Sequence, residues 1–390
     1  MSPKNMLMGL LLACAVAWGV LTALSFTAKA FPFAMAQREL LYDRGRSALN
    51  DYYMPWKCAH EGYAQESERI DYESPDGRKL TMDRLDRCYP ALALLPYRLL
   101  PYSNAAAAGF SLACGLVFLL ALAFVARASG LPAVTGPLLF ATGFFLFTLE
   151  RANPVPLAAA SVAVFLVWHD SPSRPRRFAA AVALAFATAL KLSPAVLGVL
   201  YLRRRDFRSV FVSASLTLAF ILLPFGLLGG WTGLASWADA AMTHGREMVG
   251  FSAFGFAPFA RAIRIFRGED WQTGISLWCQ ATRLVGLAAL AVAAFLPRRN
   301  DAVLWAVVGL LLAPGNMLFY AGLYLVPVAL VRSAGWRRGS SRDWTEAAVW
   351  FALFFALQLP FRGFAVNRLV AAAAVFALPL FALRPREDAS

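Results

Sequence analysis

Histidine and acidic residues are scarce in this chain of 390 residues. It contains three histidines, and 23 Asp and Glu against 37 Lys and Arg. No HExxH run occurs, and His60, His169 and His244 are not paired at ligand spacing, which argues against a zinc enzyme. A Walker-type phosphate loop and a Gly-rich dinucleotide fingerprint are missing too, which argues against an ATP-driven pump and a Rossmann-like nucleotide-sugar domain. The sequence indicates no metal site and no cofactor.

Charged residues of both signs make up only 15% of the chain, whereas 59% of the residues are hydrophobic. Soluble domains are about 45–50% apolar. The apolar residues form blocks of about 20, such as Met6–Phe26, Ala105–Val125 and Val210–Leu228. A hydrocarbon layer of about 30 Å requires helices of this length, with their backbone hydrogen bonds made internally. The pattern predicts an integral membrane protein.

The net charge of +14 arises from arginine clusters in short loops between the apolar blocks. Such clusters mark the cytoplasmic side of a membrane protein, so no nucleic-acid partner is expected. The clusters are Arg174, Arg176 and Arg177; Arg203, Arg204, Arg205 and Arg208; Arg298 and Arg299; and Arg332, Arg337, Arg338 and Arg342.

This charge pattern predicts an all-α, polytopic fold with about 12 membrane-crossing helices and both termini in the cytoplasm. Helices are expected over about 6–27, 105–126, 208–229 and 274–296 within a single domain, 1–390. The first helix resembles a signal peptide, but its apolar run is longer than the usual 7–15 residues, which favours an uncleaved helix. Residues 28–104 would form a first extracytoplasmic loop and residues 231–272 a second extracytoplasmic segment.

Aromatic and basic residues are mixed in both of these outer segments, over 31–57 and 231–271. Stretches of this kind suit helices lying in the membrane interface, with aromatic rings at headgroup level. Tyr52, Tyr53 and Trp56 are examples in the first loop.

Two hairpins are too short for the membrane. Phe178–Lys191 has 14 residues and reaches about 21 Å as a helix, short of about 30 Å. Its turn, with Lys191, would lie within the membrane depth, where a lysine faces either a wet cavity or the headgroups by snorkelling. The same holds, less severely, for the turn with Glu150, Arg151 and Asn153.

Cys58 and Cys88 both lie in the first outer loop, where an oxidising compartment would permit a disulfide. Such a bridge would contribute about 3 kcal/mol in the chain-entropy model. Two thiols are the alternative. Cys14, Cys114 and Cys279 are expected to pack as small hydrophobic residues.

Four short motifs follow one another along the chain: NDYYMPW at Asn50–Trp56, CYPALA at Cys88–Ala93, KLSP at Lys191–Pro194 and APGN at Ala313–Asn316. In this order and on this side of the membrane, they resemble glycosyltransferase family 87. That resemblance implies a GT-C fold, a polyprenyl-phosphate-sugar donor and an inverting transfer to a lipid or glycan acceptor outside the cytoplasm, with mannose as the default sugar. The chain would then lie in the inner or plasma membrane.

Asp51 occupies the position at which the family places a catalytic aspartate. It would deprotonate the acceptor hydroxyl as general base, while cationic side chains stabilise the polyprenyl-phosphate leaving group. Candidates for holding the donor phosphate or sugar are Lys191, Arg151, Asn153, Asn316, Tyr320, Arg362 and Arg368.

Alternatives remain for the role of Asp51. It could cap an interface helix or pair with Arg44 or Arg46, and Asp43, Asp71, Asp83 and Asp86 are rival carboxylates in the same loop.

The chain departs from the family at two turns. Ala313–Tyr320 lacks the expected histidine, and Glu150–Asn153 keeps only Asn153 of a Gly-Gln-x-Asn pattern. These departures leave the donor sugar open. Two other functions remain: a transporter or flippase for lipid-linked glycans, and a polysaccharide polymerase or ligase that uses the same lipid carriers.

Overall fold

The computed structural model describes residues 2–10, 12–13, 16, 49–61, 69–75, 77, 79–83, 88–247, 253–268, 275–314, 317, 319–337, 340–355 and 366–383. Within these ranges the fold is helical apart from one β-hairpin.

Both halves of the chain form α-helices. Those of the first half are α3 (Asn50–Glu61), α4 (Ala91–Leu99), α5 (Asn104–Ala128), α6 (Gly143–Arg151), α7 (Val155–Trp168), α8 (Arg174–Leu190), α9 (Val199–Arg203) and α10 (Phe207–Leu222). Those of the second half are α11 (Gly230–Glu247), α12 (Ala257–Phe266), α13 (Ile275–Phe295), α14 (Arg299–Leu312), α15 (Leu325–Ser333), α16 (Ser341–Phe355), α17 (Val366–Ala377) and α18 (Leu380–Leu383). Short 3-10 helices are η2 (Ala133–Thr135), η3 (Pro137–Ala141), η4 (Ser193–Gly198), η5 (Leu223–Leu227) and η7 (Phe319–Tyr324).

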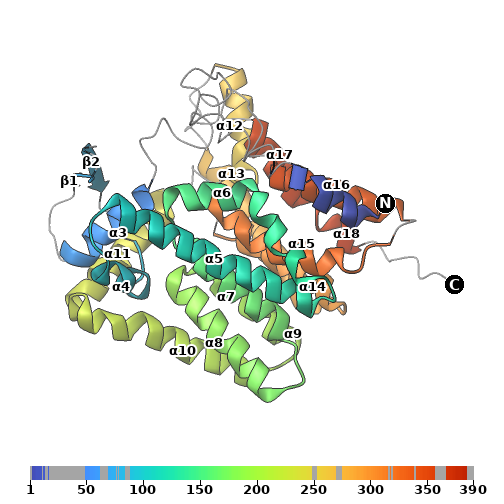
Figure 1. The fold of residues 1–390 in the computed structure, drawn as a ribbon, viewed down its shortest axis with the longest axis horizontal. Helices are drawn as coiled ribbons and strands as arrows, with labels where there is room; N and C mark the ends of the chain where they lie inside the picture. The colour runs from blue at the N-terminus through green and yellow to red at the C-terminus, as the bar shows by residue number, and fades with distance from the viewer. Residues whose placement is uncertain are drawn as a thin grey trace.

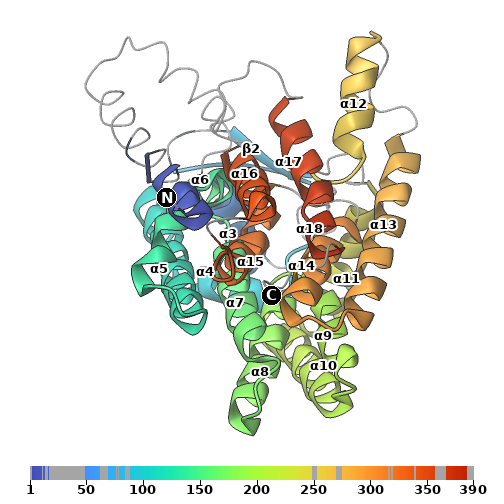
Figure 2. The same ribbon diagram turned by 90° about the vertical axis from the view of Figure 1, so that its right-hand side faces the viewer.

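The helices form a bundle with two distinct ends. In Figure 1, α3, α4 and α11 gather at the left end, while α9 and the start of the chain lie toward the right. Figure 2 views the molecule from that right-hand side. The centre of the bundle is a large apolar core in which α7 packs on α5 and α8, and α13 packs on α14.

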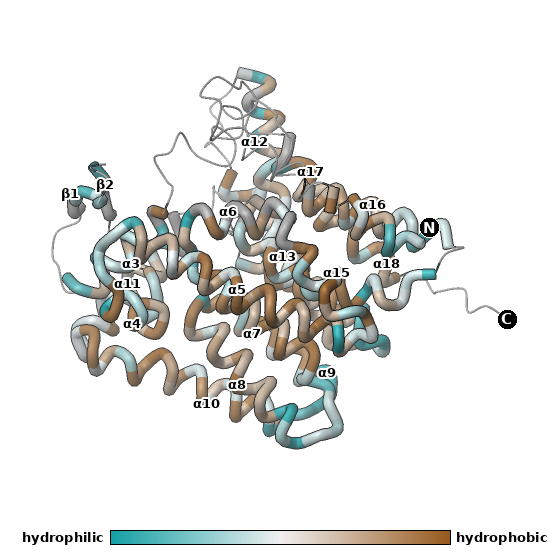
Figure 3. Tube along the Cα trace, in the orientation of Figure 1, coloured by the Kyte–Doolittle hydropathy of each residue, from teal (hydrophilic) through white to brown (hydrophobic). Residues whose placement is uncertain are grey.

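Three helices within the described ranges are long and apolar enough to cross a membrane, judged by length and composition. They are α5, the continuous run of α10 and η5 (Phe207–Leu227), and α13, and they confirm that three of the predicted apolar helices form. Large apolar side chains on them face outward: Leu112 is 67% exposed, Phe211 73% and Leu284 67%. Figure 3 shows hydrophobic residues along these helices. Such outward faces suit contact with lipid.

The short hairpins predicted from the sequence are present. Helix α7 has 14 residues and reaches about 21 Å, and α8 has 17 residues and reaches about 26 Å, because it begins at Arg174 rather than at Phe178. The return from Lys191 is broken, with the 3-10 helix η4 followed by the five residues of α9. Both helices are shorter than a hydrocarbon layer of about 30 Å.

A β-hairpin in the first loop was not predicted from the sequence. Strands β1 (Arg69–Glu73) and β2 (Lys79–Asp83) pair antiparallel, with Arg69 opposite Asp83 and Glu73 opposite Lys79. Its turn contains Gly77 at φ 80°, whose N–H donates to the Ser74 carbonyl at 2.9 Å. Glycine reaches this left-handed conformation without steric cost. The Ser-Pro-Asp-Gly run at 74–77 was the available signal.

A buried ion triad ties α14, α15 and α16 together. Arg332 was predicted to lie in a cytoplasmic arginine cluster, yet it is only 3% exposed. Its guanidinium donates to Asp301 at 2.9 Å and to Glu346 through two nitrogens, one of them at 3.0 Å. A charge buried this deeply requires such partners.

Candidate active site

Helix α3 carries Asp51 and is anchored by aromatic side chains. Tyr52 and Tyr53 are fully buried, and Tyr52 packs against the rings of Tyr97 and Phe110 at centroid distances of 5.3 and 5.9 Å. The expectation that these two rings contact lipid headgroups is therefore wrong. Their rings find a cluster of other aromatic residues on α4 and α5, which buries them inside the protein.

Hydrogen bonds fix the orientation of α3 on the segment that follows α4. The Tyr52 hydroxyl donates to the Pro101 carbonyl at 2.8 Å, and the Trp56 Nε1–H donates to the Leu100 carbonyl at 2.7 Å. The Tyr53 hydroxyl donates to Asn104 Oδ1 at the start of α5. Buried tyrosine and tryptophan usually satisfy their polar atoms in this way. The result is a fixed platform for Asp51.

The Asp51 carboxylate is only 4% exposed and is bound by two side chains from the turn after α6. Arg151 forms a bidentate pair with it, Nε to Oδ2 at 3.0 Å and Nη2 to Oδ1 at 2.7 Å. The Asn153 amide donates to Oδ2 at 2.5 Å. Bidentate Arg–carboxylate pairs are both strong and geometrically specific. The structure thus pairs Asp51 with Arg151; Arg44 and Arg46, the partners considered from the sequence, lie outside the described residues.

The backbone of the turn explains how Arg151 and Asn153 reach the same carboxylate. Ala152, the residue between them, has a left-handed φ of 53°, which reverses the chain at the end of α6. Left-handed conformation costs a non-glycine residue about 1–2 kcal/mol. The Asn153 Oδ1 accepts from the Val155 N–H at 3.0 Å, which fixes the amide so that its nitrogen points to Asp51. Local strain therefore occurs next to the proposed base, as is common at functional sites.

The electrostatic environment keeps Asp51 ionised. Burial raises the pKa of the Asp51 carboxyl, but the charge and hydrogen bonds of Arg151, the Asn153 amide and the charge of Lys191 outweigh burial. The net pKa lies below its ordinary value. The carboxylate can accept a proton, but while Arg151 holds it, it is a weak base.

Lys191 projects from the end of α8 toward two aromatic rings. Its Nζ lies 4.5 Å from the centroid of Tyr89 and 5.6 Å from that of Tyr320. These distances are within the range of cation–π attraction. Lys191 also lines a cavity, which is compatible with the first of the two roles considered for it.

That cavity has a volume of about 370 Å³. Polar and aromatic side chains line one part of it and apolar side chains the rest: Cys88, Tyr89, Pro90, Val155, Lys191, Leu192, Ser193, Ala241, His244, Pro314, Met317, Tyr320, Ala321 and Tyr324. Val155 connects the cavity to the Asp51 site, because its side chain lines the cavity while its N–H holds Asn153.

The predicted site residues fall into three groups. Asp51, Arg151 and Asn153 are bonded to one another, and Lys191 and Tyr320 lie together at the adjoining cavity. Arg368, on α17, is instead close to the like charge of Arg261 on α12 and does not line the cavity. Asn316 and Arg362 lie outside the described residues.

Cys58 and Cys88 are present as two thiols, so the predicted disulfide is not formed in the structure. Cys58 is buried on α3 among the aromatic cluster, whereas Cys88 lines the cavity beside Lys191. The Cys88 backbone is held there by the Trp237 Nε1–H, which donates to its carbonyl at 3.1 Å. The two side chains thus belong to different parts of the site.

Two residues at the cavity were not among the predicted site residues. Tyr89 was quoted only as part of a motif, and its proximity to Lys191 depends on the packing of α4 against α8. His244 comes from α11, and its rarity as one of three histidines was the available signal. Among the described residues, no group of three or more His, Cys, Asp or Glu could hold a metal ion.

Comparison with known proteins agrees with the motif order seen in the sequence. The model of glycosyltransferase family 87 matches residues 89–320, more than half of the chain. This region contains the cavity residues Tyr89, Lys191 and Tyr320 as well as Arg151 and Asn153, and it follows Asp51. No curated protein and no solved structure matches the chain. With its apolar helices and a match across both short hairpins, the chain belongs to glycosyltransferase family 87 and is a membrane-associated glycosyltransferase, acting with a sugar donor on a glycan or lipid acceptor.

Proposed function

We propose that the protein transfers a hexose, by default mannose, from a polyprenyl-phosphate donor to a lipid or glycan acceptor on the extracytoplasmic side of the membrane. The observation that carries this proposal is the buried Asp51 carboxylate beside the cavity with Lys191. A GT-C arrangement of about 12 spans, with both termini in the cytoplasm, would place α3 and this cavity on the outer side.

In the proposed reaction, an acceptor hydroxyl oxygen attacks the anomeric carbon from the face opposite the phosphate. The new C–O bond forms as the bond from the anomeric carbon to the phosphate oxygen breaks, which inverts the configuration. The hydroxyl proton passes to Asp51, and polyprenyl phosphate leaves with the bonding electron pair. Lys191 would stabilise its negative charge, because a preorganised cation is most effective where charge develops.

Arg151 has two roles in this proposal. It pairs with Asp51 in the structure, which keeps the pKa of the carboxyl low. A donor phosphate arriving beside Lys191 would compete for the Arg151 guanidinium, since both oxyanions suit its bidentate geometry. Loss of that partner would raise the pKa of Asp51 and strengthen it as a base. Binding of the donor would thereby activate Asp51 for the transfer reaction of that donor.

The test is transfer by purified protein in lipid nanodiscs, with a panel of radiolabelled polyprenyl-phosphate sugars. Replacement Asp51→Asn should lower the transfer rate about 10³-fold, the middle of the range for a general base. Asp71→Asn is the matched control, because Asp71 is a rival carboxylate of the same loop on β1. It should leave the rate near that of the wild type. Comparable activity in Asp51→Asn would overturn the assignment of the base.

The same experiment separates the alternatives. A growing glycan as the only accepted acceptor would identify a polymerase or ligase. Passage of lipid-linked glycan across liposomes without any sugar transfer would favour a transporter and contradict the proposal. Retention of anomeric configuration in the product, measured by NMR, would contradict the single-displacement step.

A further inference from the structure

A second cavity, of about 380 Å³, lies at the arginine-rich end, between the first turns of α8 and α10. Its lining is polar on one side and apolar on the other. The lining residues are Arg174, Pro175, Arg177, Phe178, Ala181, Asp206, Arg208, Ser209 and Val212. Three arginines face one aspartate, which leaves the lining with a net charge of +2. None of these residues takes part in the Asp51 site.

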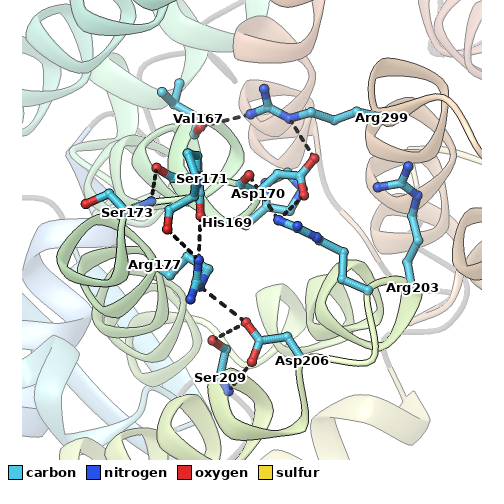
Figure 4. Close-up of polar contacts among 12 residues, drawn as sticks. Val167, His169, Asp170, Ser171, Ser173, Arg177, Arg203, Asp206, Ser209 and Arg299 are labelled. Atoms are coloured by element: carbon cyan, nitrogen blue, oxygen red, sulfur yellow. Dashed lines mark hydrogen bonds and ion pairs between the residues drawn. The ribbon is translucent and has the colours of Figure 1, made fainter.

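The aspartate and one of the arginines already have partners. Asp206 accepts from the Ser209 N–H at 3.1 Å and from its hydroxyl at 2.7 Å, and so caps α10. Arg177 Nε lies 3.6 Å from Asp206, and its Nη1 donates to the carbonyls of Ser171 and Pro172 at 2.8 and 3.0 Å. Figure 4 shows this group of contacts. The acid in the cavity is therefore occupied by structural bonds.

Neighbouring arginines on the same side of the bundle are occupied as well. Arg204 pairs with Asp170, and Arg203 donates to the carbonyls of Leu296 and Pro297, just after α13. Arg299 donates to the carbonyls of Leu166 and Val167 at 2.7 and 2.8 Å. These three arginines hold helix ends together, so their contacts within the protein explain their presence.

Arg174 and Arg208 differ from them. Both are exposed, both line the cavity, and within the described part of the chain neither makes a hydrogen bond or an ion pair. Two guanidinium groups without a carboxylate partner among the described residues thus line one cavity. Guanidinium groups bind phosphate well, because their planar donors match its oxygens.

The apolar side of the cavity indicates which kind of phosphate compound it would bind. Phe178 lines it and is 57% exposed, and Phe207 and Phe211 on α10 are 66% and 73% exposed. Phe207 and Phe211 belong to the outer face of α10, a helix apolar enough to lie in a membrane. A ligand with a phosphate at one end and hydrocarbon at the other would satisfy the arginines and cover the rings together, whereas free phosphate would leave the rings uncovered.

We propose that this cavity binds the headgroup phosphate of an anionic phospholipid, with Arg174 and Arg208 as its ligands and Phe178 against the first acyl carbons. This site is distinct from the sugar-transfer site, and the proposal does not depend on the donor or acceptor.

The test is native mass spectrometry of the detergent-purified full chain, titrated with phosphatidylglycerol or phosphatidylcholine. The double variant Arg174→Gln/Arg208→Gln should bind phosphatidylglycerol about 30-fold more weakly, since each arginine near an anionic lipid contributes about a factor of five. The control is Arg176→Gln/Arg205→Gln, which removes the same charge from exposed residues that do not line the cavity. It should bind like the wild type.

Three results would overturn the proposal. Equal weakening in the two double variants would mean a general surface-charge effect, and equal binding of phosphatidylcholine would remove the anionic headgroup as the cause. Displacement of the lipid by submillimolar inorganic phosphate would identify free phosphate as the ligand instead. Thermal unfolding without added lipid verifies that each variant is folded, and Arg208→Gln alone, expected to weaken binding about fivefold, replaces the double variant if needed.

Discussion

Arg151 and Lys191 lie at the ends of two short helices, α6 and α8, and the protein holds these two cations in different ways. Arg151 is bonded to the Asp51 carboxylate through two nitrogens, whereas Lys191 lies against the rings of Tyr89 and Tyr320. No carboxylate in the described part of the chain lies within ion-pair distance of Lys191. Aromatic rings attract a cation without neutralising it, since their interaction is with a quadrupole.

The difference suggests separate tasks. A guanidinium bonded to the proposed base sets the position and protonation of that base. An ammonium that faces a cavity without a carboxylate partner is ready for an incoming anion. The two cations can therefore be tested independently, by substitutions that remove one kind of contact at a time.

Of the substitutions that test this comparison, those at Lys191 should have the largest effect. Replacement by Gln removes the charge that faces the cavity, so the transfer rate should fall about 10²–10³-fold, as for loss of one preorganised donor to a developing anion. Lys191→Arg keeps the charge and should recover part of the rate. Steady-state kinetics with varied donor concentration measures both. An unchanged rate in Lys191→Gln would exclude Lys191 from phosphate stabilisation.

Arg151→Gln should have an intermediate effect, up to about 100-fold on kcat/KM, because it disturbs the position of Asp51. Without Arg151, burial dominates and the pKa of Asp51 rises, so the acid limb of the pH–rate profile should move to higher pH. An acid limb that stays in place would show that Arg151 does not control the protonation of Asp51.

Arg151→Gln should also destabilise the fold, by about 3 kcal/mol, at the low end for a buried pair because the Arg151 side chain is 24% exposed. In the wild type this stabilisation is present at neutral pH and is lost as the pH falls through the lowered pKa of Asp51. Urea unfolding of both proteins at neutral pH and at low pH measures the difference between their free energies of unfolding. This difference should become smaller at low pH.

Tyr89→Leu should have the smallest effect, a rise of about two- to fivefold in the donor KM, since it removes one cation–π contact of about 0.5–1 kcal/mol while the Tyr320 ring remains beside Lys191. Tyr89→Phe keeps the ring against Lys191 and should stay within about twofold of the wild type. If the donor KM of Tyr89→Phe rises as much as that of Tyr89→Leu, donor binding depends on the Tyr89 hydroxyl rather than on the ring face.

The sequence identified most members of the site but not their connections. Asp51, Arg151 and Asn153 were all selected, but Arg151 was assigned to the donor phosphate or sugar, and its pairing with Asp51, 100 residues away, was not predicted. Only the packing of α3 against the turn after α6 makes them partners. The shortness of the helix that ends at Lys191, by contrast, followed from counting residues in one hairpin.

The buried tyrosines and the cysteines show the same limit of prediction from the sequence. Tyr52 and Tyr53 carry rings that suit a membrane interface and a protein core equally well, and only their contacts with α4 and α5 decide between the two. Cys58 and Cys88 share one loop in the sequence, but α3 directs Cys58 into the aromatic cluster while Trp237 holds Cys88 at the cavity. Residence in one loop does not fix the distance between two side chains.

The sequence alone determined the membrane character, the short hairpins and the arginine-rich loops, because these depend on local composition and on the length of each apolar run. Tertiary structure decided which charge neutralises which. It placed Asp51 with Arg151, enclosed Lys191 between two rings, and left Arg174 and Arg208 facing one cavity. Such pairings depend on distances of a few ångströms between segments far apart in the chain, which only the packed fold sets.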